Sequence, residues 1–254
     1  MRGKFLFLAL MFFSLSAWGA VPAGDLLEGI QPGPDGKIDV LAVFPHQDDE
    51  MYCDGTLLKM KTDPRVRIHF LVMTLGDLSP SKDVLGITPE RMAAIRIKEM
   101  GKVAEVIGAD SYIQGDLHDQ GLPNLPKEEL AARILEVIKF THAELIIGYG
   151  PEGIYGHPDH IAGSLAADLA FRQSAAQKLY YVNVPHALYP IYHLYSKTNP
   201  LPATLKVDVR RFKKMKRLAI SEQTSQKHFT GRIEKLEMSL NFNYEYFTLA
   251  ATKP

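Results

Sequence analysis

Four ionisable side chains fall within five positions of one short segment, Pro45-His46-Gln47-Asp48-Asp49-Glu50. Imidazole nitrogens and carboxylate oxygens are both common zinc ligands, and a catalytic zinc site keeps one position open for water. His46 and Asp49 are three residues apart, so a turn or an opening helical turn can direct both to one side and leave Asp48 free to act as a base. The same acidic cluster could instead cap the helix that follows, because Asp and Glu favour helix N-termini.

A second segment, Gly153-Ile154-Tyr155-Gly156-His157-Pro158-Asp159-His160, places two histidines three residues apart, with Pro158 where a helix would begin. The pair could provide one metal ligand and one acid/base group. An isolated pair of this kind is more often two surface histidines beside a loop, and this alternative stays open on spacing alone. The other histidines are scattered. Only His118 is a partial exception, because it adjoins Asp119 in a loop rich in Gly and Asp.

Short apolar runs alternate with helical patterns along the chain. The expected strands are 38–44, 66–74, 111–114, 145–149 and 179–184, and the expected helices are 50–61, 89–107, 126–140, 157–172 and 209–223. Strict alternation predicts an α/β fold, a Rossmann-like doubly wound and mostly parallel sheet with helices on both faces. Both motifs directly follow expected strands. They should therefore meet at the carboxyl edge of the sheet, where open α/β sheets bind their ligands.

Taken together, the two motifs resemble those of the PIG-L or LmbE-like family of zinc-dependent N-acetylglucosaminyl deacetylases. That family carries His-Pro-Asp-Asp-Glu after its first strand and Gly-His-Pro-Asp-His later. The resemblance covers residues 37–226 and includes Arg96-Ile97-Lys98-Glu99, Leu117-His118-Asp119-Gln120-Gly121-Leu122 and Ser225-Gln226. Three positions depart from the family pattern: Gln47 replaces a proline, Asp54 a glycine, and Gln223 a frequent histidine. None of these changes removes an implied metal ligand or the implied base.

The resemblance implies that His46, Asp49 and His160 hold a metal ion. Zinc (Zn2+) is the implied cofactor, although sites made of His and Asp accept other divalent metals too. Asp48 is implied as the general base that activates water. His157 is implied as the group that stabilises the oxyanion or donates a proton.

Three further roles follow only from the resemblance. Asp159 is implied to tune His157 by accepting its other ring proton, while Arg96 and Asp119 resemble substrate-contacting positions. The implied reaction is hydrolysis of the amide that joins an acetyl group to an N-acetylglucosamine-type substrate, either a small molecule or an oligosaccharide. Tyr52, Tyr149 and Tyr155 could offer an apolar face to a sugar or simply pack around the site.

Other functions stay open on the sequence. An amidase that removes a larger acyl group or cleaves a thiol conjugate would use the same residues. A non-catalytic exported metal- or sugar-binding protein would keep the ligands but would not need Asp48 and His157 in their places. A nucleotide-dependent transferase is disfavoured, because it would need a Gly-rich turn after the first strand, where this chain has His46 and carboxylates.

The bulk composition narrows the partners. The chain has 254 residues, with 29 Lys and Arg balanced by 29 Asp and Glu, and such a balance gives no field that attracts nucleic acid or an anionic membrane. One basic run, Arg210-Arg211-Phe212-Lys213-Lys214-Met215-Lys216-Arg217, is interpreted as a solvated helix face. Cys53 is the only cysteine, so no intramolecular disulfide and no cysteine zinc cluster can form. The sequence leaves the oligomeric state open.

The N-terminus has the pattern of a secretory signal. Arg2 and Lys4 precede an apolar run from Phe5 to Trp18, and the small residues Gly19 and Ala20 follow. The run is shorter than the roughly 20 residues needed to span a bilayer, so no permanent membrane span is expected. We therefore expect a leader at 1–20, a lead-in at 21–36 and a single domain at 37–254. The protein should be exported to the periplasm or secreted, with cleavage after Gly19 or Ala20, or with the leader kept as an anchor.

Overall fold

The computed structural model describes residues 21–184, 198–199, 201–228 and 243–253. The expected leader at 1–20 lies outside the described residues, so the export signal stays a prediction. Within the part of the chain that the structure describes, no helix has the length and apolar character needed to cross a bilayer.

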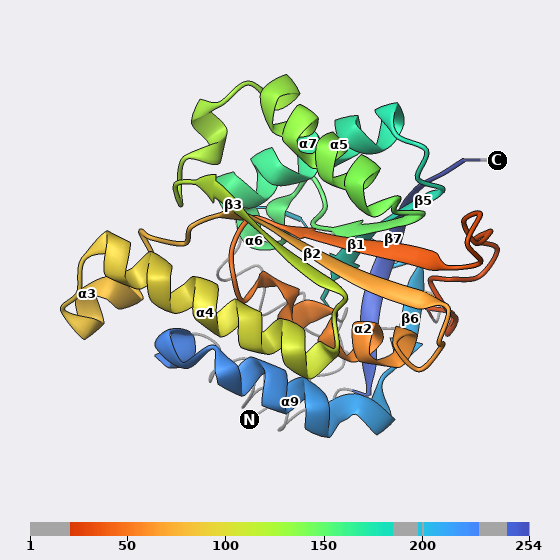
Figure 1. Cartoon of the computed structure of the whole chain (residues 1–254), viewed down its shortest axis with the longest axis horizontal. Helices are drawn as coiled ribbons and strands as arrows, with labels where there is room; N and C mark the ends of the chain where they lie inside the picture. The colour runs from red at the N-terminus through yellow and green to blue at the C-terminus, as the bar shows by residue number, and fades with distance from the viewer. Residues whose placement is uncertain (1–20, 185–197, 200, 229–242, 254) are drawn as a thin grey trace, which may run out of the picture.

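A seven-stranded sheet forms the centre of the molecule, with strand order β3-β2-β1-β4-β5-β7-β6 (Figure 1). Five strands run parallel: β1 (Ile38–Phe44), β2 (Val66–Thr74), β3 (Ser111–Leu117), β4 (Leu145–Gly148) and β5 (Lys178–Asn183). Strand β7 (Tyr244–Thr252) runs antiparallel to both β5 and β6 (Leu205–Asp208). The predicted Rossmann-like, mostly parallel α/β sheet is confirmed, and the antiparallel pair at its end is an addition that the alternation of strands and helices did not predict.

The central strands of the sheet are buried on both faces. Successive side chains of a strand point to opposite sides, and in β1 this places Val40, Ala42 and Phe44 in one core and Leu41 and Val43 in the other. One face is covered by α2 (Asp54–Met60), α4 (Pro89–Ile107) and α9 (Lys213–Glu222), and the other by α5 (Lys127–Thr141) and α7 (Pro158–Gln173) (Figure 1). Two-sided burial explains why the strands read as uninterrupted apolar runs in the sequence.

Helix boundaries follow the capping residues where the sequence supplies them. For α4, the Thr88 hydroxyl accepts a hydrogen bond from the Arg91 backbone N–H at 3.3 Å, and Gly108 ends the helix with a φ of 76°. The expected bounds of this helix, 89–107, are confirmed. The expected helix 50–61 is divided into the 3-10 turn η1 (Asp49–Tyr52) and α2, and the expected helix 209–223 into η4 (Arg210–Phe212) and α9. The other short elements are α3 (Ser81–Leu85), η2 (Leu122–Asn124), α6 (Gly153–Gly156) and η5 (Thr224–Gln226).

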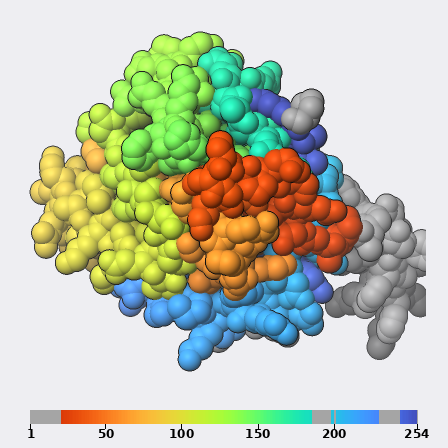
Figure 2. All heavy atoms as spheres, turned by 45° about the vertical axis from the view of Figure 1, so that its right-hand side comes forward, coloured from red at the N-terminus to blue at the C-terminus, as the bar shows by residue number. Residues whose placement is uncertain are grey.

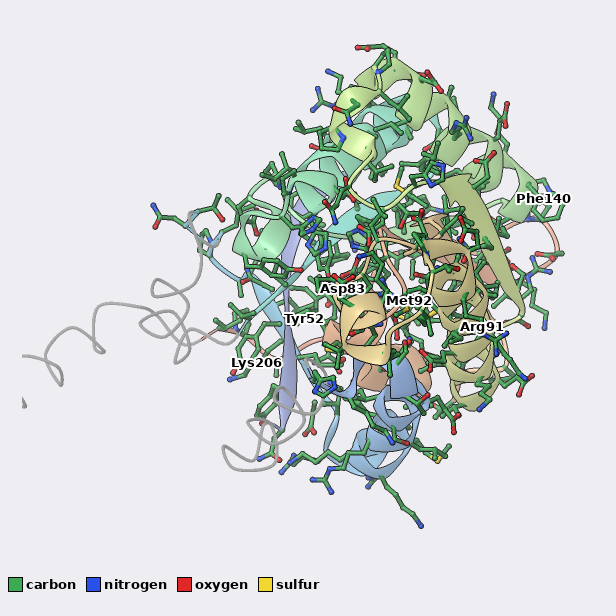
Figure 3. The ribbon with its side chains drawn as sticks, turned by 90° about the vertical axis from the view of Figure 1, so that its left-hand side faces the viewer. Tyr52, Asp83, Arg91, Met92, Phe140 and Lys206 are labelled. Carbon is green, nitrogen blue, oxygen red and sulfur yellow. The ribbon has the colours of Figure 1, made fainter. Side chains whose placement is uncertain are left out.

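The strand order fixes where a ligand can enter. From β1 the chain proceeds to β2 and β3 on one side, whereas β4 and β5 lie on the other side, so the order reverses between β1 and β4. Loops diverge at such a reversal and leave a crevice at the carboxyl edge. Both sequence motifs follow the two strands that flank it. Figure 3 views the molecule from this edge, with Asp83 of α3 towards the viewer.

The lead-in residues 21–36 pack onto the same body. Leu26 and Ile30 are buried in the core that faces α2 and α4, and Ala23 forms a β-bridge with Lys206 of β6. Figure 2 shows this N-terminal segment in red, lying directly against the orange residues that lead from α2 into β2. The segment thus contributes apolar side chains to the folded domain.

A buried ion pair ties the C-terminal elements to the start of α2. The Glu245 carboxylate on β7 accepts hydrogen bonds from the backbone N–H groups of Gly55 (3.0 Å) and Thr56 (2.7 Å) and lies 2.8 Å from the Lys216 ammonium. Both Lys216 and Glu245 are buried. The expectation that the basic run at 210–217 is a solvated face therefore holds for most of its charges but fails at Lys216.

We expect Glu245→Ala to destabilise the protein by about 3–5 kcal/mol, because it breaks the buried ion pair with the Lys216 ammonium and removes the acceptor of two buried amide N–H groups. The matched control is Lys102→Ala, which breaks the exposed pair with Glu222 and should cost at most about 1 kcal/mol. Chemical denaturation followed by circular dichroism measures both. Equal denaturation midpoints for the two variants would contradict the prediction.

Candidate active site

The loop after β1 carries the first motif in a constrained backbone. Asp48 has a φ of 90°, in the left-handed region that few residues other than glycine adopt. Opposite it, Gly76 has a φ of 62°, and a Cβ there would lie 2.2 Å from the Gln47 Oε1 and 2.6 Å from an Arg96 guanidinium nitrogen. Glycine is therefore required at 76 for the loop after β2 to approach the motif so closely. This packing turns His46 and Asp49 to one side and Asp48 to another.

Three potential metal ligands converge between the two motifs. The His46 Nδ1 lies 3.2 Å from the His160 Nε2 and 3.3 Å from the Asp49 Oδ2, and the Asp49 Oδ1 lies 3.2 Å from the His160 Nε2. All three side chains are buried. Ligands of a tetrahedral zinc, held at about 2.0–2.1 Å, lie about 3.3 Å from one another. The expected trio His46, Asp49 and His160 therefore has the spacing of a metal centre.

The protons on the two imidazoles are directed away from this point. The His160 Nδ1 lies 3.2 Å from the Gly153 carbonyl oxygen, which can only accept, so Nδ1 donates and the Nε2 lone pair is free. The His46 Nε2 lies 3.0 Å from carboxylate oxygens of both Asp119 and Asp159, so in the neutral imidazole Nε2 donates and Nδ1 has the lone pair. Two lone pairs and a carboxylate then face one another, an arrangement that a cation between them would stabilise.

A second group of acidic residues lies on the other side of the His46 ring and is already satisfied. His46, Asp119 and Asp159 are close enough to be considered as ligands, as are His46, His157 and His160. The Asp159 carboxylate, however, also accepts the backbone N–H groups of Gln120 (2.6 Å) and Leu122 (3.2 Å). Its lone pairs are thus directed to hydrogen bonds, and it is best described as an outer partner that orients His46, as carboxylates commonly do for metal-bound histidines.

This arrangement corrects the predicted partner of Asp159. Among the described residues, its carboxylate bonds to His46, Gln120 and Leu122, and the contact with His157 is made instead by the Asp159 backbone N–H, which donates to the His157 Nδ1 at 3.2 Å. The physical reason is that His157 is the N-cap of α7, where a side-chain acceptor satisfies a free helix N–H. Asp159, two residues further on, directs its carboxylate towards His46 and the loop after β3 instead.

The site has a negative potential. Burial alone would lower the pKa of His46, but its hydrogen bonds to Asp119, Asp159 and Asp49 raise that pKa well above its ordinary value. Such a potential stabilises a positive charge next to His46, whether a proton or a metal ion. Together with the spacing of the donor atoms, it indicates that His46, Asp49 and His160 fit a divalent metal.

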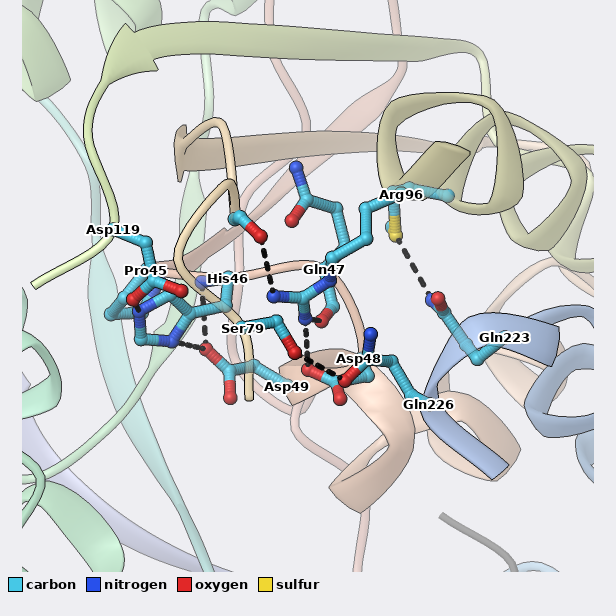
Figure 4. Close-up of polar contacts among 12 residues, drawn as sticks. Pro45, His46, Gln47, Asp48, Asp49, Ser79, Arg96, Asp119, Gln223 and Gln226 are labelled. Carbon is cyan, nitrogen blue, oxygen red and sulfur yellow. Dashed lines mark hydrogen bonds and ion pairs between the residues drawn. The ribbon is translucent and has the colours of Figure 1, made fainter. Parts of the chain in front are cut away.

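Asp48 lies beside the three ligands and is held by Arg96. One guanidinium nitrogen of Arg96 is 2.9 Å from the Asp48 Oδ1 and also donates to the Gln47 carbonyl, and the other donates to the Gly76 carbonyl at 3.4 Å (Figure 4). Burial raises the pKa of Asp48 to about 6, although the Arg96 charge opposes this rise. Arg96 itself is only 3% exposed, so the structure places it beneath the loop as a partner of Asp48. Its expected role as a substrate contact stays a prediction.

Residues that depart from the family pattern support the same loop. Gln47, which stands where the family pattern has a proline, is buried, and its amide donates to the Thr74 carbonyl at 3.1 Å. Gln223 donates to the Glu50 Oε1 at 3.2 Å, and the Glu50 Oε2 accepts the Asp48 backbone N–H at 2.9 Å. Hydrogen bonds thus anchor the segment on both sides of Asp48, and the loop does not depend on a proline.

His157 lies on the open side of the cluster. Its ring centroid is 5.0 Å from that of His46 and 4.8 Å from that of His160, and the side chain is partly exposed. Burial, and then the neighbouring His46 and His160, lower its pKa. Tyr149 stacks on His160 with centroids 4.4 Å apart, so this tyrosine packs against the centre, whereas Tyr155 is 40% exposed beside His157. Because it is partly exposed, the His157 imidazole is accessible to a substrate that approaches the buried cluster.

Asp119 is brought to the centre, but as a partner of His46. Its Oδ1 is 3.0 Å from the His46 Nε2, and burial leaves it 6% exposed. Its expected contact with substrate therefore stays a prediction. Asp77 was not predicted as a site residue; it follows β2 and accepts a hydrogen bond from the Asp119 backbone N–H at 2.9 Å. The rule that placed both motifs at the carboxyl edge would have indicated Asp77 as well, since it also follows a strand.

Comparison with known proteins identifies a family for this geometry. Residues 41–171 match the family model described as "PIG-L: GlcNAc-PI de-N-acetylase". A relative from Catenulispora acidiphila, named 1D-myo-inositol 2-acetamido-2-deoxy-alpha-D-glucopyranoside deacetylase 2, is 28% identical over 178 residues, which are 60% of this chain and 59% of that protein. A relative from Bacillus cereus, a probable N-acetyl-alpha-D-glucosaminyl L-malate deacetylase 2, is 33% identical over 126 residues, 48% of this chain and 56% of that protein.

A solved structure shares the fold over most of the chain. The N,N'-diacetylchitobiose deacetylase from Pyrococcus horikoshii superposes with a TM-score of 0.63 at 19% identity, covering 87% of each chain. The matched region spans less than two thirds of the length of the two relatives named above. The family match nevertheless covers more than half of this chain and includes both motifs and all three candidate ligands. This chain belongs to the PIG-L family.

Proposed function

We propose that this protein is a metal-dependent hydrolase that removes an acetyl group from the amide nitrogen of an N-acetylglucosamine-type substrate. The observation that carries the proposal is the set of donor atoms of His46, Asp49 and His160, spaced 3.2–3.3 Å apart with the carboxylate of Asp48 alongside. Family membership and the names of the two relatives, which are deacetylases of glucosamine conjugates, support the substrate class. Zinc is the metal we propose, because two imidazoles and one carboxylate with an open position suit catalytic zinc.

The residues around this centre divide the chemistry. A divalent metal held by His46, Asp49 and His160 would supply a Lewis acid that polarises the acyl carbonyl and lowers the pKa of water. Asp48, fixed by Arg96, accepts the proton of the attacking water. His157, on the open side, stabilises the negative charge that develops on the carbonyl oxygen, and either it or Asp48 protonates the departing amine.

We also propose that the protein acts outside the cytoplasm, in the periplasm or as a secreted protein. The basic, apolar and small-residue pattern at 1–20 supports this proposal. Export would direct the enzyme towards amino sugars of the cell envelope or the surroundings. Fractionation of cells that express the full chain, followed by N-terminal sequencing of the product, tests both the location and cleavage after Gly19 or Ala20.

Release of acetate from N-acetylglucosamine and its short oligomers tests the activity. We expect the metal-loaded protein to release acetate, a chelator to abolish release, and added zinc to restore it. An N-propionyl and an N-butyryl glucosamine in the same panel identify an amidase for larger acyl groups. Sugar binding without release of any acid would contradict the proposal and indicate a non-catalytic binding protein.

Arg96 should act on turnover through Asp48. We expect Arg96→Met to lower kcat by about 10- to 100-fold with a smaller change in KM, because a base displaced by about 1 Å loses roughly that much rate and Arg96 fixes Asp48 through Oδ1 and the preceding carbonyl. The metal content should remain that of the wild type. A change confined to KM would instead indicate that Arg96 contacts the substrate. Arg91, exposed at the start of the same helix, provides Arg91→Met as the control.

A further inference from the structure

The loop that follows β3 is fastened to the candidate active site at several points. Asp119 contacts the His46 ring at 3.0 Å, while the backbone N–H groups of Gln120 and Leu122 donate to the Asp159 carboxylate at 2.6 and 3.2 Å. Gln120 has a φ of 63°, which bends the loop around Asp159. The position of this loop is therefore set by the same residues that orient the metal ligand His46.

One side chain of this loop is directed outward. His118, next to Asp119, has a side chain that is 75% exposed. Its Nδ1 is nevertheless fixed 2.7 Å from the Asp77 Oδ2, and the other oxygen of Asp77 accepts the Asp119 backbone N–H at 2.9 Å. Asp77 is buried, so a single rigid carboxylate holds both the outer imidazole and the residue that contacts His46. The His118 imidazole is thus fixed at Nδ1 and otherwise exposed, in the residue next to Asp119.

The charge of this imidazole is also set by Asp77. Its hydrogen bond and its negative charge raise the pKa of His118, which favours the imidazolium with both ring nitrogens as donors. Among the described residues, Asp77 is the only carboxylate within ion-pair distance of His118. The deacetylation chemistry assigned to His46, Asp48, Asp49, His157 and His160 does not use this exposed donor.

We propose that His118, positioned by Asp77, binds a negatively charged group of the substrate, such as a carboxylate attached to the amino sugar. This inference rests on the proposed function and names the substrate class for it: an acidic N-acetylglucosamine derivative in preference to a neutral one. The acetamido group reaches the buried ligands, while His118, one residue from Asp119, meets a substituent at the rim of the site.

The test compares two glycosides that differ by one carboxylate, methyl and carboxymethyl N-acetylglucosaminide. Affinities are measured by calorimetry on the metal-loaded protein, and acetate release is followed in parallel. We expect the wild type to bind the carboxymethyl glycoside about fivefold more tightly, the size of effect that an exposed ion pair provides. His118→Gln should remove this preference and leave binding of the methyl glycoside unchanged, whereas His118→Lys should retain it because the positive charge remains.

The control is His142→Gln, which alters another exposed histidine at the end of α5, away from the carboxyl edge. It should bind both glycosides as the wild type does. Equal affinity of the wild type for the two glycosides, or a preference that survives in His118→Gln, would overturn the proposal. A preference for the carboxymethyl glycoside without acetate release from either compound would support the role of His118 and contradict the proposed deacetylase activity instead.

Discussion

Asp48→Asn is expected to lose about 10²- to 10⁴-fold in kcat while it keeps its metal, because it removes the proposed general base and leaves the three proposed metal ligands in place. The substitution suits this position. Asn tolerates the left-handed backbone that Asp48 adopts at a φ of 90°, and its side-chain oxygen can still accept the hydrogen bond that Arg96 donates at 2.9 Å. The variant thus changes the ability to accept a proton and little else.

Two measurements decide the assignment of the base. Metal content, determined by mass spectrometry on protein dialysed against metal-free buffer, should equal that of the wild type. Turnover of an N-acetylglucosamine glycoside should fall, with KM nearly constant. The control is Asp35→Asn, an exposed carboxylate in the lead-in segment, which should leave turnover unchanged. Near-normal kcat in Asp48→Asn would show that another group accepts the proton.

The fold could be predicted from the sequence where local signals and burial agree. Strand 38–44 has the bounds expected from its apolar run. Helix 89–107 has the bounds expected from Thr88 and Pro89 at its start and Gly108 at its end. Strands β6 and β7 were not predicted. They lie at one end of the sheet, where side chains are less buried, as the partly exposed residues of β6 show. Their sequences therefore mix apolar and polar residues and do not form an uninterrupted apolar run. Residues 50–61 read as one helix, but the left-handed Asp48 starts a 3-10 turn before α2 begins.

For the site, the sequence could indicate which residues meet but not all the bonds between them. The carboxyl-edge rule brings His46 and His160 together from positions 114 residues apart, and the structure places their nitrogens at 3.2 Å. It could not show that Asp159 serves His46, since that depends on how the loop after β3 presents its N–H groups to the carboxylate. Nor could it show that Arg96 lies under Asp48, because the approach requires a glycine at 76.

Two substitutions distinguish the proposed inner ligands of the metal from the outer partners that orient them. His160→Gln removes the nitrogen of a proposed ligand, which lies 3.2 Å from both the His46 Nδ1 and the Asp49 Oδ1. We expect metal affinity to fall by more than about 100-fold, beyond the 10- to 100-fold that loss of an outer partner typically causes. At zinc concentrations that load the wild type, the variant should lack its metal and should therefore release no acetate. Competition with a chelating dye measures the affinity, and the rise in Tm on adding zinc provides an independent readout, since a ligand stabilises the folded state that binds it.

Asp159→Asn is the matched comparison, because it alters the opposite side of the same imidazole. Asp159 orients His46 through Nε2 and is held by two backbone N–H groups, so its loss should weaken metal binding by about 10- to 100-fold and leave a measurable zinc-dependent rise in Tm. Which of the two variants loses more metal affinity shows where the ion binds. A larger loss in Asp159→Asn than in His160→Gln would place the metal among His46, Asp119 and Asp159, and the assignment of His160 as a ligand would then be wrong.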